Sequence, residues 1–268
     1  MKKNPLAELW PTQSVELLKA LHILTREGQL NQDSRRKLKQ VQHLVQLITP
    51  SLEGLKTIAD MGAGKSYLGF MLYDLWMQTR PDTHLWAVEQ RVELVETCRK
   101  LALESQFDRI SFAPHSILDA ISSKELPTEI DAVTALHACD TATDEAIAFA
   151  LSKNAKFVAL VPCCQAEVAR LLAKLPADAP EEMQVLWRHG LHRREFGSHL
   201  TNVIRCLFLE SQGYKVRVTE LIGWEHSMKN EIILAERTGT PNARSRAQLE
   251  SLIDKIPLKM RLFELAAF

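Results

Sequence analysis

The chain has 268 residues, and its 33 Lys and Arg residues balance 33 Asp and Glu residues, so the formal net charge is zero. Its hydrophobic fraction of 46% allows a sizeable core and excludes general disorder, and its length suits one large domain or one domain with an appendage. Zero net charge excludes a protein that binds nucleic acid through overall positive charge, so any such contact requires a local basic patch.

Nothing in the sequence predicts export or insertion into a membrane. No apolar run approaches the roughly 18–20 residues that cross a bilayer, and the N-terminal Met1-Lys2-Lys3-Asn4-Pro5 is not followed by the apolar region of a signal peptide. The five cysteines are an odd number and are thinly spread, which argues against a disulfide framework. We therefore expect a cytoplasmic protein with no membrane contact, and the sequence leaves its oligomeric state open.

Residues 1–50 are predicted to form an N-terminal helical extension. An apolar stripe runs from Leu17 to Leu24, and the segment from Ser34 to Ile48 again carries apolar residues at helical spacing. The other face of this second segment is basic, with Arg35, Arg36, Lys37 and Lys39. Such a run is usually a solvated helix face, and the alternative is that it contacts a substrate. Pro50 and Gly54 break the pattern, so we expect the main domain to span residues 51–268.

From Leu55 the pattern changes to short apolar strands that alternate with helices. The five candidate strands are Lys56–Asp60, His84–Glu89, Ile110–Ala113, Ala132–His137 and Phe157–Pro162. The candidate helices between and after them are Tyr67–Gln78, Val92–Leu103, Asp144–Leu151, Glu167–Leu175 and Ser198–Gln212. Short, almost wholly apolar strands separated by helices predict a parallel, doubly wound sheet with both faces covered.

Two further strand-like runs, Tyr214–Leu221 and Glu231–Glu236, follow the last long helix. Too few residues join them for a crossover helix, so we expect them to pair antiparallel at one edge of the sheet. The segment after Thr240 is expected to form one or two terminal helices. The predicted fold class is therefore α/β, with a mainly parallel sheet, an antiparallel C-terminal strand and an N-terminal helical extension.

The first strand meets the first helix of the main domain at the loop Asp60-Met61-Gly62-Ala63-Gly64-Lys65-Ser66. Glycines at such a point let the backbone turn sharply and approach a ligand closely, and the start of the helix supplies unpaired amide groups. One interpretation is a phosphate-binding loop, with Gly64-Lys65-Ser66 as its G-K-S and Ala59 in place of the first glycine. That alternative predicts a nucleotide hydrolase or kinase.

The second interpretation is a site for S-adenosylmethionine (SAM). Asp60, Gly62 and Gly64 resemble the first motif of class I methyltransferases, with Ser66 where a third glycine is usual. The resemblance implies that the acid helps to hold the methionine ammonium and that the glycines make room for the cofactor. Glu89 ends the second strand, where a carboxylate can accept hydrogen bonds from both ribose hydroxyls. A carboxylate at Asp60 would repel a triphosphate, so SAM is favoured over a nucleotide.

Three segments resemble one branch of these enzymes more closely. They are Asp60-Met61-Gly62-Ala63-Gly64-Lys65-Ser66-Tyr67-Leu68, Leu136-His137-Ala138-Cys139-Asp140 and Val161-Pro162-Cys163-Cys164-Gln165. They are similar to the D-x-G-x-G-K, L-H-A-C and P-C-C motifs of the methyltransferase-domain family that includes methyltransferases with a glutathione-transferase C-terminal domain. Lys229-Asn230 also looks like a feature of that family. The resemblance covers roughly residues 35–237, and it implies a Rossmann-like class I methyltransferase with SAM as cofactor but no particular acceptor.

Ligands of open α/β sheets bind at the carboxyl ends of the strands. After the third strand, Ser116 is positioned to hydrogen-bond the adenine amine and Ile117 to cover the ring, with Asp119 as the alternative partner. His137, at the end of the fourth strand, is interpreted either as a general base or as a residue that only shapes the cofactor pocket.

Cys163 and Cys164 end the fifth strand, and Cys139 lies on the strand beside it. Three interpretations are open: packing residues, metal ligands together with His137, or a nucleophile of the kind that attacks a cytosine ring. Adjacent cysteines lack the C-x-x-C spacing of a zinc site, so we expect no metal. Packing is favoured, and a catalytic cysteine is the alternative that we keep.

The densest cationic stretch is Trp187-Arg188-His189-Gly190-Leu191-His192-Arg193-Arg194-Glu195-Phe196. Arg and His interleaved with aromatic residues suit phosphate contact and base stacking, and the alternative is a solvated surface. We expect Arg193 and Arg194, with Lys229 and Asn230, to contact the substrate. RNA is favoured as the acceptor over a protein or a small molecule, and a binding module without catalytic activity is a further alternative.

Overall fold

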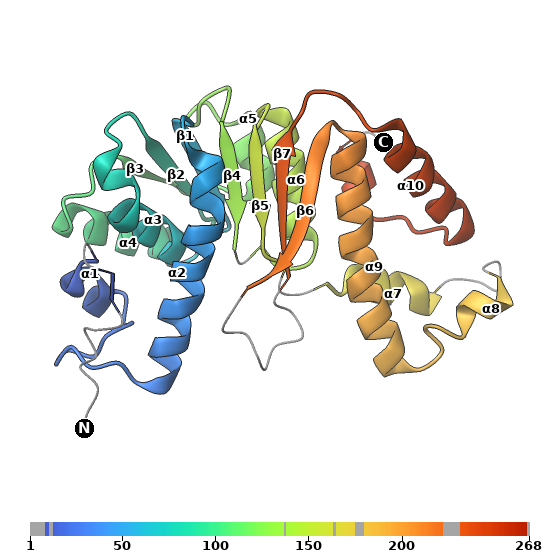
Figure 1. Ribbon diagram of the computed structural model, residues 1–268, viewed down its shortest axis with the longest axis horizontal. Coiled ribbons are helices and arrows are strands. Elements are labelled where there is room, and N and C mark those ends of the chain that lie inside the picture. The colour runs from blue at the N-terminus through green and yellow to red at the C-terminus, as the bar shows by residue number, and fades with distance from the viewer. Residues whose placement is uncertain are drawn as a thin grey trace.

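The computed structural model describes residues 9–10, 13–136, 138–162, 165–174, 180–221 and 231–266. These residues form a seven-stranded sheet with the strand order β3-β2-β1-β4-β5-β7-β6 (Figure 1). The strands are β1 (Thr57–Met61), β2 (His84–Val88), β3 (Ile110–Ala113), β4 (Ala132–Ala135), β5 (Phe157–Leu160), β6 (Tyr214–Glu220) and β7 (Glu231–Arg237). Each strand predicted from the sequence is present, with ends that differ by two residues or fewer.

The sheet is parallel from β1 to β5 and antiparallel at its C-terminal side. Ile58 of β1, for example, pairs with Leu85 of β2 on one side and Ala132 of β4 on the other. β7 pairs antiparallel with both β5 and β6, which confirms the predicted antiparallel pair. In the strand order, β7 lies between β5 and β6, so β6 forms the edge of the sheet.

The helices are α1 (Val15–Ala20), α2 (Gln32–Leu52), α3 (Tyr67–Leu75), α4 (Val92–Glu104), α5 (Ile117–Ser122), α6 (Thr141–Ser152), α7 (Glu167–Lys174), α8 (Glu181–Gln184), α9 (Gly190–Ser211), α10 (Ala243–Lys255) and α11 (Arg261–Leu265). α5 and α8 were not predicted, and α9 begins at Gly190 instead of Ser198. The predicted helix Tyr67–Gln78 ends at Leu75, because the backbone of Trp76 leaves the helical region before a short 3-10 turn. No helix in the described part of the chain is long and apolar enough to cross a membrane.

Helices cover both faces of the sheet, and each face has its own hydrophobic core (Figure 1). Side chains of α1 to α4 join one core, and side chains of α5, α6, α9, α10 and α11 join the other. Successive residues of a strand enter opposite cores: Ile58 of β1 belongs to the first and Ala59 to the second. The almost wholly apolar strands are thus explained by burial on both sides.

The N-terminal helices belong to the first of these cores. Leu38 and Ile48 of α2 are fully buried in the same cluster as Ile58 of β1. α2 continues to Leu52, so the predicted boundary after residue 50 falls within a helix. The division into residues 1–50 and 51–268 stays a prediction, and the packing shows that the extension shares its core with the sheet.

Two long helices begin at the edge where the parallel strands end. Short connections join the end of α2 to the start of β1 and the end of α9 to the start of β6. β6 runs parallel to β1, because β7 is antiparallel to both β5 and β6. The first turns of α2 and α9 therefore lie on either side of the carboxyl edge of the sheet, as Figure 1 shows.

The contact between α7 and α9 depends on Gly197. A Cβ atom at this position would lie 2.8 Å from the backbone nitrogen of Ala169 and 2.9 Å from its Cα atom. Both contacts are with backbone, so a larger residue forces the two helices apart. We expect Gly197→Ala to lower the free energy of unfolding by about 1–3 kcal/mol, measured by urea denaturation.

Gly190→Ala is the matched control, because it lies on the same helix and a Cβ atom there meets nothing within 4 Å. This variant is expected to be neutral or to gain up to about 1 kcal/mol, since alanine restricts the unfolded chain. Equal stabilities for the two variants would contradict the close approach of α7 and α9.

Candidate active site

The loop after β1 makes the turn that the sequence predicts. Gly62 and Gly64 have φ angles of +65° and +60°, in the left-handed region that glycine adopts without strain. Ser66 also has a left-handed backbone and precedes the first residue of α3. The amide of Ala63 donates to the carbonyl oxygen of Val88 at 2.9 Å, which holds the loop against β2. The turn therefore presents its backbone to the residues that follow β2.

Glu89, directly after β2, is the carboxylate that faces this loop. It is 6% exposed and accepts a hydrogen bond from the Gly64 amide at 2.8 Å. The backbone amide and guanidinium of Arg91 donate three more, the shortest from Nε at 2.8 Å. Burial alone raises the pKa of Glu89, but the hydrogen bonds from Arg91 and Gly64 outweigh it and hold this pKa below its ordinary value. Glu89 is therefore an ionised carboxylate whose oxygens each accept two hydrogen bonds.

Asp60 lies in β1 and is 2% exposed. Burial raises its pKa to about 7, although a hydrogen bond from Thr134 Oγ1 at 2.8 Å favours the charged form. Asp60 lines a small hollow together with Gly62, Tyr67 and Leu136. A carboxylate with this pKa gains or loses its proton near neutral pH, and a cation bound beside it would stabilise the charged form.

A cavity of about 340 Å³ lies beside Glu89, at the carboxyl ends of β1 to β4. It brings together Gly62, Glu89, Ser116 and Ile117, which the sequence predicted as one site. The hydroxyl of Ser116 is already engaged, because it accepts from the Asp119 amide and donates to the Asp119 carboxylate at 2.6 Å. Ser116 thus caps α5, and Ile117 supplies an apolar part of the wall.

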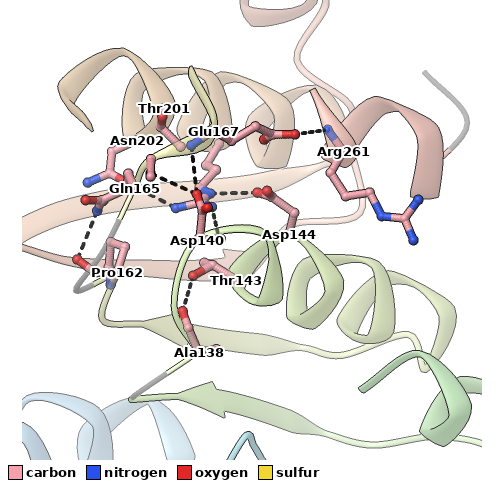
Figure 2. A network of polar contacts seen from close by, with 12 residues as sticks. Ala138, Asp140, Thr143, Asp144, Pro162, Gln165, Glu167, Thr201, Asn202 and Arg261 are labelled. Carbon is pink, nitrogen blue, oxygen red and sulfur yellow. Dashed lines mark hydrogen bonds and ion pairs between the residues drawn. The ribbon is translucent and has the colours of Figure 1, made fainter. Parts of the chain in front are cut away.

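Two residues of this region make contacts that the sequence analysis did not predict. Arg91 lines the cavity and binds Glu89, and the two are separated by only one residue, a spacing that offers no motif. Asp140 follows β4 and has a backbone φ of +55°, which is unusual for a residue other than glycine. Its carboxylate accepts from the amides of Ala166 and Glu167, both at 2.9 Å, so it caps the start of α7 (Figure 2).

A buried arginine holds this loop in place. Arg205 of α9 pairs with Asp144 of α6, with a distance of 2.7 Å from Nε to Oδ1, and both side chains are almost completely buried. Its Nη2 atom donates to the carbonyl oxygen of Asp140, also at 2.7 Å. The turn after β4 is therefore fixed to α6 and α9 by one guanidinium group.

The same helix also reaches the loop after β5. Asn202 of α9 accepts a hydrogen bond from Gln165, whose Nε2 atom also donates to the carbonyl oxygen of Pro162 at 2.9 Å (Figure 2). Ser198 donates to the Gln165 side chain at 2.7 Å. Polar side chains of α9 thus position the segments after β4 and β5 together.

Five of the predicted site residues lie outside the described residues, namely His137, Cys163, Cys164, Lys229 and Asn230. Arg193 and Arg194 lie in the first turns of α9, and Arg194 pairs with its neighbour Glu195 at 2.8 Å. In the described part of the chain, no group of three or more His, Cys, Asp or Glu side chains is arranged to hold a metal ion.

The aromatic residues of the basic segment are not arranged for base stacking as predicted. Trp187 is buried and its ring stacks on Phe196, with 5.5 Å between centroids. Glu195, in the same segment, lines a polar cavity with Glu231. This segment therefore has exposed cations that can contact phosphate, but its tryptophan is not exposed for stacking on a base.

We expect Arg205→Met to lower the free energy of unfolding by about 3–5 kcal/mol, because it leaves the Asp144 carboxylate buried without its partner. Arg246→Met, which breaks the exposed pair with Glu250, is the matched control and should cost about 1 kcal/mol or less. Urea denaturation followed by circular dichroism measures both. A loss at Arg205 no larger than that at Arg246 would show that the buried pair does not hold α6 and α9 together.

Comparison with solved structures shows the same kind of fold. A protein from Klebsiella pneumoniae assigned as an O-methyltransferase is 16% identical, with a TM-score of 0.51 over 87% of this chain and 93% of that chain. The SAH-bound methyltransferase PaMTH1 from Podospora anserina is 12% identical, with a TM-score of 0.49 over 84% and 88%. Magnesium protoporphyrin IX methyltransferase from Synechocystis PCC 6803 is 14% identical, with a TM-score of 0.47 over 83% and 93%. No curated protein sequence matches the chain.

The family comparison identifies the chain. Residues 36–171, just over half of its length, match the model of a family described as a methyltransferase domain. The matched segment contains most of α2, β1 to β5, the glycine loop and the cavity beside Glu89. The chain belongs to this methyltransferase-domain family and is a SAM-dependent methyltransferase with a Rossmann-like fold.

Proposed function

We propose that SAM binds in the cavity beside Glu89 and that the enzyme methylates RNA. The observation that carries the cofactor assignment is the buried, ionised carboxylate of Glu89 next to the Gly62–Gly64 turn. Two ribose hydroxyls suit such an acceptor, and the turn lets a ligand approach the backbone closely. Ile117 would contact the adenine ring, and Asp60 would face the methionine ammonium.

The same contacts argue against a phosphate-binding loop. The Gly64 amide, which such a loop would direct at a phosphate, donates to Glu89 instead. Asp60 and Glu89 also place two carboxylates around the turn, which would repel a triphosphate. The donors and acceptors of the site therefore fit a cationic cofactor that carries hydroxyl groups.

Arg91 competes with the ribose for Glu89. Its guanidinium makes two of the four hydrogen bonds to the carboxylate, yet its side chain is 56% exposed. An exposed side chain can turn into water at little cost. We infer that the ribose hydroxyls replace the Arg91 side chain on Glu89, while the Gly64 amide stays bound.

SAM supplies a methyl group that is already activated on a sulfonium centre. The protein then has to bind, orient and exclude water, and the described residues are arranged for these tasks. Arg205 and Asp140 hold the wall of the cavity after β4, and Tyr67 begins α3 at the other side of the turn. His137 as a base and Cys163 or Cys164 as a nucleophile stay proposals from the sequence.

Glu89→Ala is expected to weaken SAM binding about tenfold or more, because it removes charge-assisted hydrogen bonds of about 1.5–3 kcal/mol each. Arg91→Ala should leave the affinity at least as high as in the wild type, because the arginine only occupies the carboxylate. Titration calorimetry with SAM and S-adenosylhomocysteine measures both. An equal loss in the two variants would mean that Arg91 contacts the cofactor and that the replacement model is wrong.

Support for an RNA acceptor comes from cations at the carboxyl edge. Lys37 and Lys39 of α2 are exposed there, and Arg188 is exposed just before α9. The two helices begin on either side of the carboxyl edge of the sheet, and residues at that edge line the cavity beside Glu89. Phosphate contacts of this kind position a nucleic acid without reading its sequence. Arg193 and Arg194 would extend the contact along α9.

The acceptor is tested by incubating the enzyme with isotopically labelled SAM and, separately, with total RNA or total protein from cells that lack it. We expect the label in RNA and its release by ribonuclease, with less label from Glu89→Ala at a SAM concentration near the Kd of the wild type. Binding of RNA should weaken with salt, and neutralising Arg193 and Arg194 should flatten the log–log slope by about 0.7 for each lost single-strand contact. Label found in protein alone would exclude RNA.

A further inference from the structure

A second cavity, of about 280 Å³, lies between the N-terminal helices and the carboxyl edge of the sheet. Its walls come from α2, α3 and the residues that follow α1, β4 and β6. Most of its lining is apolar, namely Ile23, Val41, Leu44, Leu136 and Leu221, and Tyr67, Lys37 and Gln40 complete it. The cofactor contacts proposed above use none of these residues.

This apolar cavity and the cavity beside Glu89 share no lining residue, but a small hollow at Asp60 shares residues with each of them. Tyr67 and Leu136 line both the apolar cavity and the small hollow that contains Asp60. Gly62 in turn lines both that hollow and the cavity beside Glu89. A molecule in the apolar cavity would therefore lie next to the end of the cofactor site where Asp60 is found, and away from the adenine side at Ile117.

The lining specifies the chemistry of an occupant. Lys37, Gln40, Val41 and Leu44 follow one another at helical spacing, so α2 presents one stripe with a cation at its outer end. Lys37 is exposed and makes no ion pair with another described residue. The size is near the lower end of the about 300–1,000 Å³ of small-molecule pockets. The site therefore suits a group of about the size of one ring system with an anion beside it.

We propose that this cavity holds the methyl acceptor, as a single unstacked nucleobase with its phosphate at Lys37. The proposal rests on the proposed function, because it takes RNA as the substrate. Single-stranded bases bind proteins by stacking on aromatic side chains inside apolar pockets, and Tyr67 is the aromatic residue of this lining. The N-terminal helix α2 then forms one wall of the acceptor site.

The first test compares two lysines on the same helix. Lys37→Ala removes the cation that lines the cavity, and Lys39→Ala removes an exposed lysine of α2 that does not line it. Binding of a random-sequence single-stranded oligoribonucleotide is measured by fluorescence anisotropy with S-adenosylhomocysteine present. We expect Lys37→Ala to flatten the log–log salt slope by about 0.7 and to weaken binding more than Lys39→Ala does. Equal effects of the two variants on affinity and on the salt slope would show that Lys37 makes no phosphate contact of its own.

The second test changes the cavity itself. Val41→Trp fills the cavity, and Tyr67→Ala removes its aromatic wall. Because a base is expected to stack on Tyr67, we expect Tyr67→Ala to raise the KM for RNA about fivefold or more. Transfer of label from SAM to total RNA by Val41→Trp should fall about tenfold or more, with binding of S-adenosylhomocysteine nearly unchanged. Thermal melting of each variant shows whether it is folded, and Lys37→Ala, at an exposed position, provides a variant whose folding is not at issue.

The outcomes separate the two proposals. If the wild type labels no RNA, RNA is not the substrate and the nucleobase assignment falls with it. If the wild type labels RNA and Val41→Trp is equally active, RNA stays the substrate and the cavity is not its site. If Val41→Trp weakens S-adenosylhomocysteine binding as much as methyl transfer, the cavity belongs to the cofactor, which also overturns the inference.

Discussion

The carboxyl edge of the sheet depends on the contacts of one buried group, the guanidinium of Arg205. A buried charge is costly unless partners surround it, and Arg205 has the carboxylate of Asp144 and the carbonyl oxygen of Asp140. One partner lies in α6 and the other in the loop after β4, so the pair links a helix, a loop and α9. Asn202, one turn before Arg205 in α9, accepts a hydrogen bond from Gln165 after β5 and so extends the link to that loop. Two strand ends are thereby held in one arrangement.

Burial and hydrogen bonding together set the pKa values of the two carboxylates at the glycine loop. Glu89 is kept ionised by its donors, whereas Asp60 has one hydroxyl donor and a pKa raised to about 7 by burial. Two carboxylates in such different surroundings can take different roles on one side of the sheet. Glu89 is suited to accept hydrogen bonds from neutral hydroxyl groups, and Asp60 is suited to face a cation that stabilises its charged form. Both features agree with a cofactor that has a ribose and an ammonium group.

The N-terminal helices combine a structural and a proposed functional role. α2 buries Leu38 and Ile48 in the core of the sheet and, on a neighbouring stripe, lines the apolar cavity with Val41 and Leu44. The helix that forms this wall of the cavity is therefore anchored in the core behind it. A site built on such a helix is held more precisely than one built on a loop. An extension outside the parallel sheet can in this way shape the space beside the proposed cofactor site.

Three features could be predicted from the sequence, namely the succession of strands along the chain, the glycine turn and the position of Glu89. Strand alternation, backbone freedom and strand ends are local properties, so a local pattern is enough to predict them. Three other features depend on the folded chain, namely the Arg205–Asp144 pair, the ion pair of Arg91 with Glu89 and the cavity lined by α2. Arg205 lies 61 positions from Asp144, and no local pattern relates two such residues. The start of α9 was missed for a related reason, since His189 makes no side-chain cap and packing on α7 at Gly197 fixes that part of the helix. Contacts between distant segments depend on how the layers pack, and packing is a property of the folded chain as a whole.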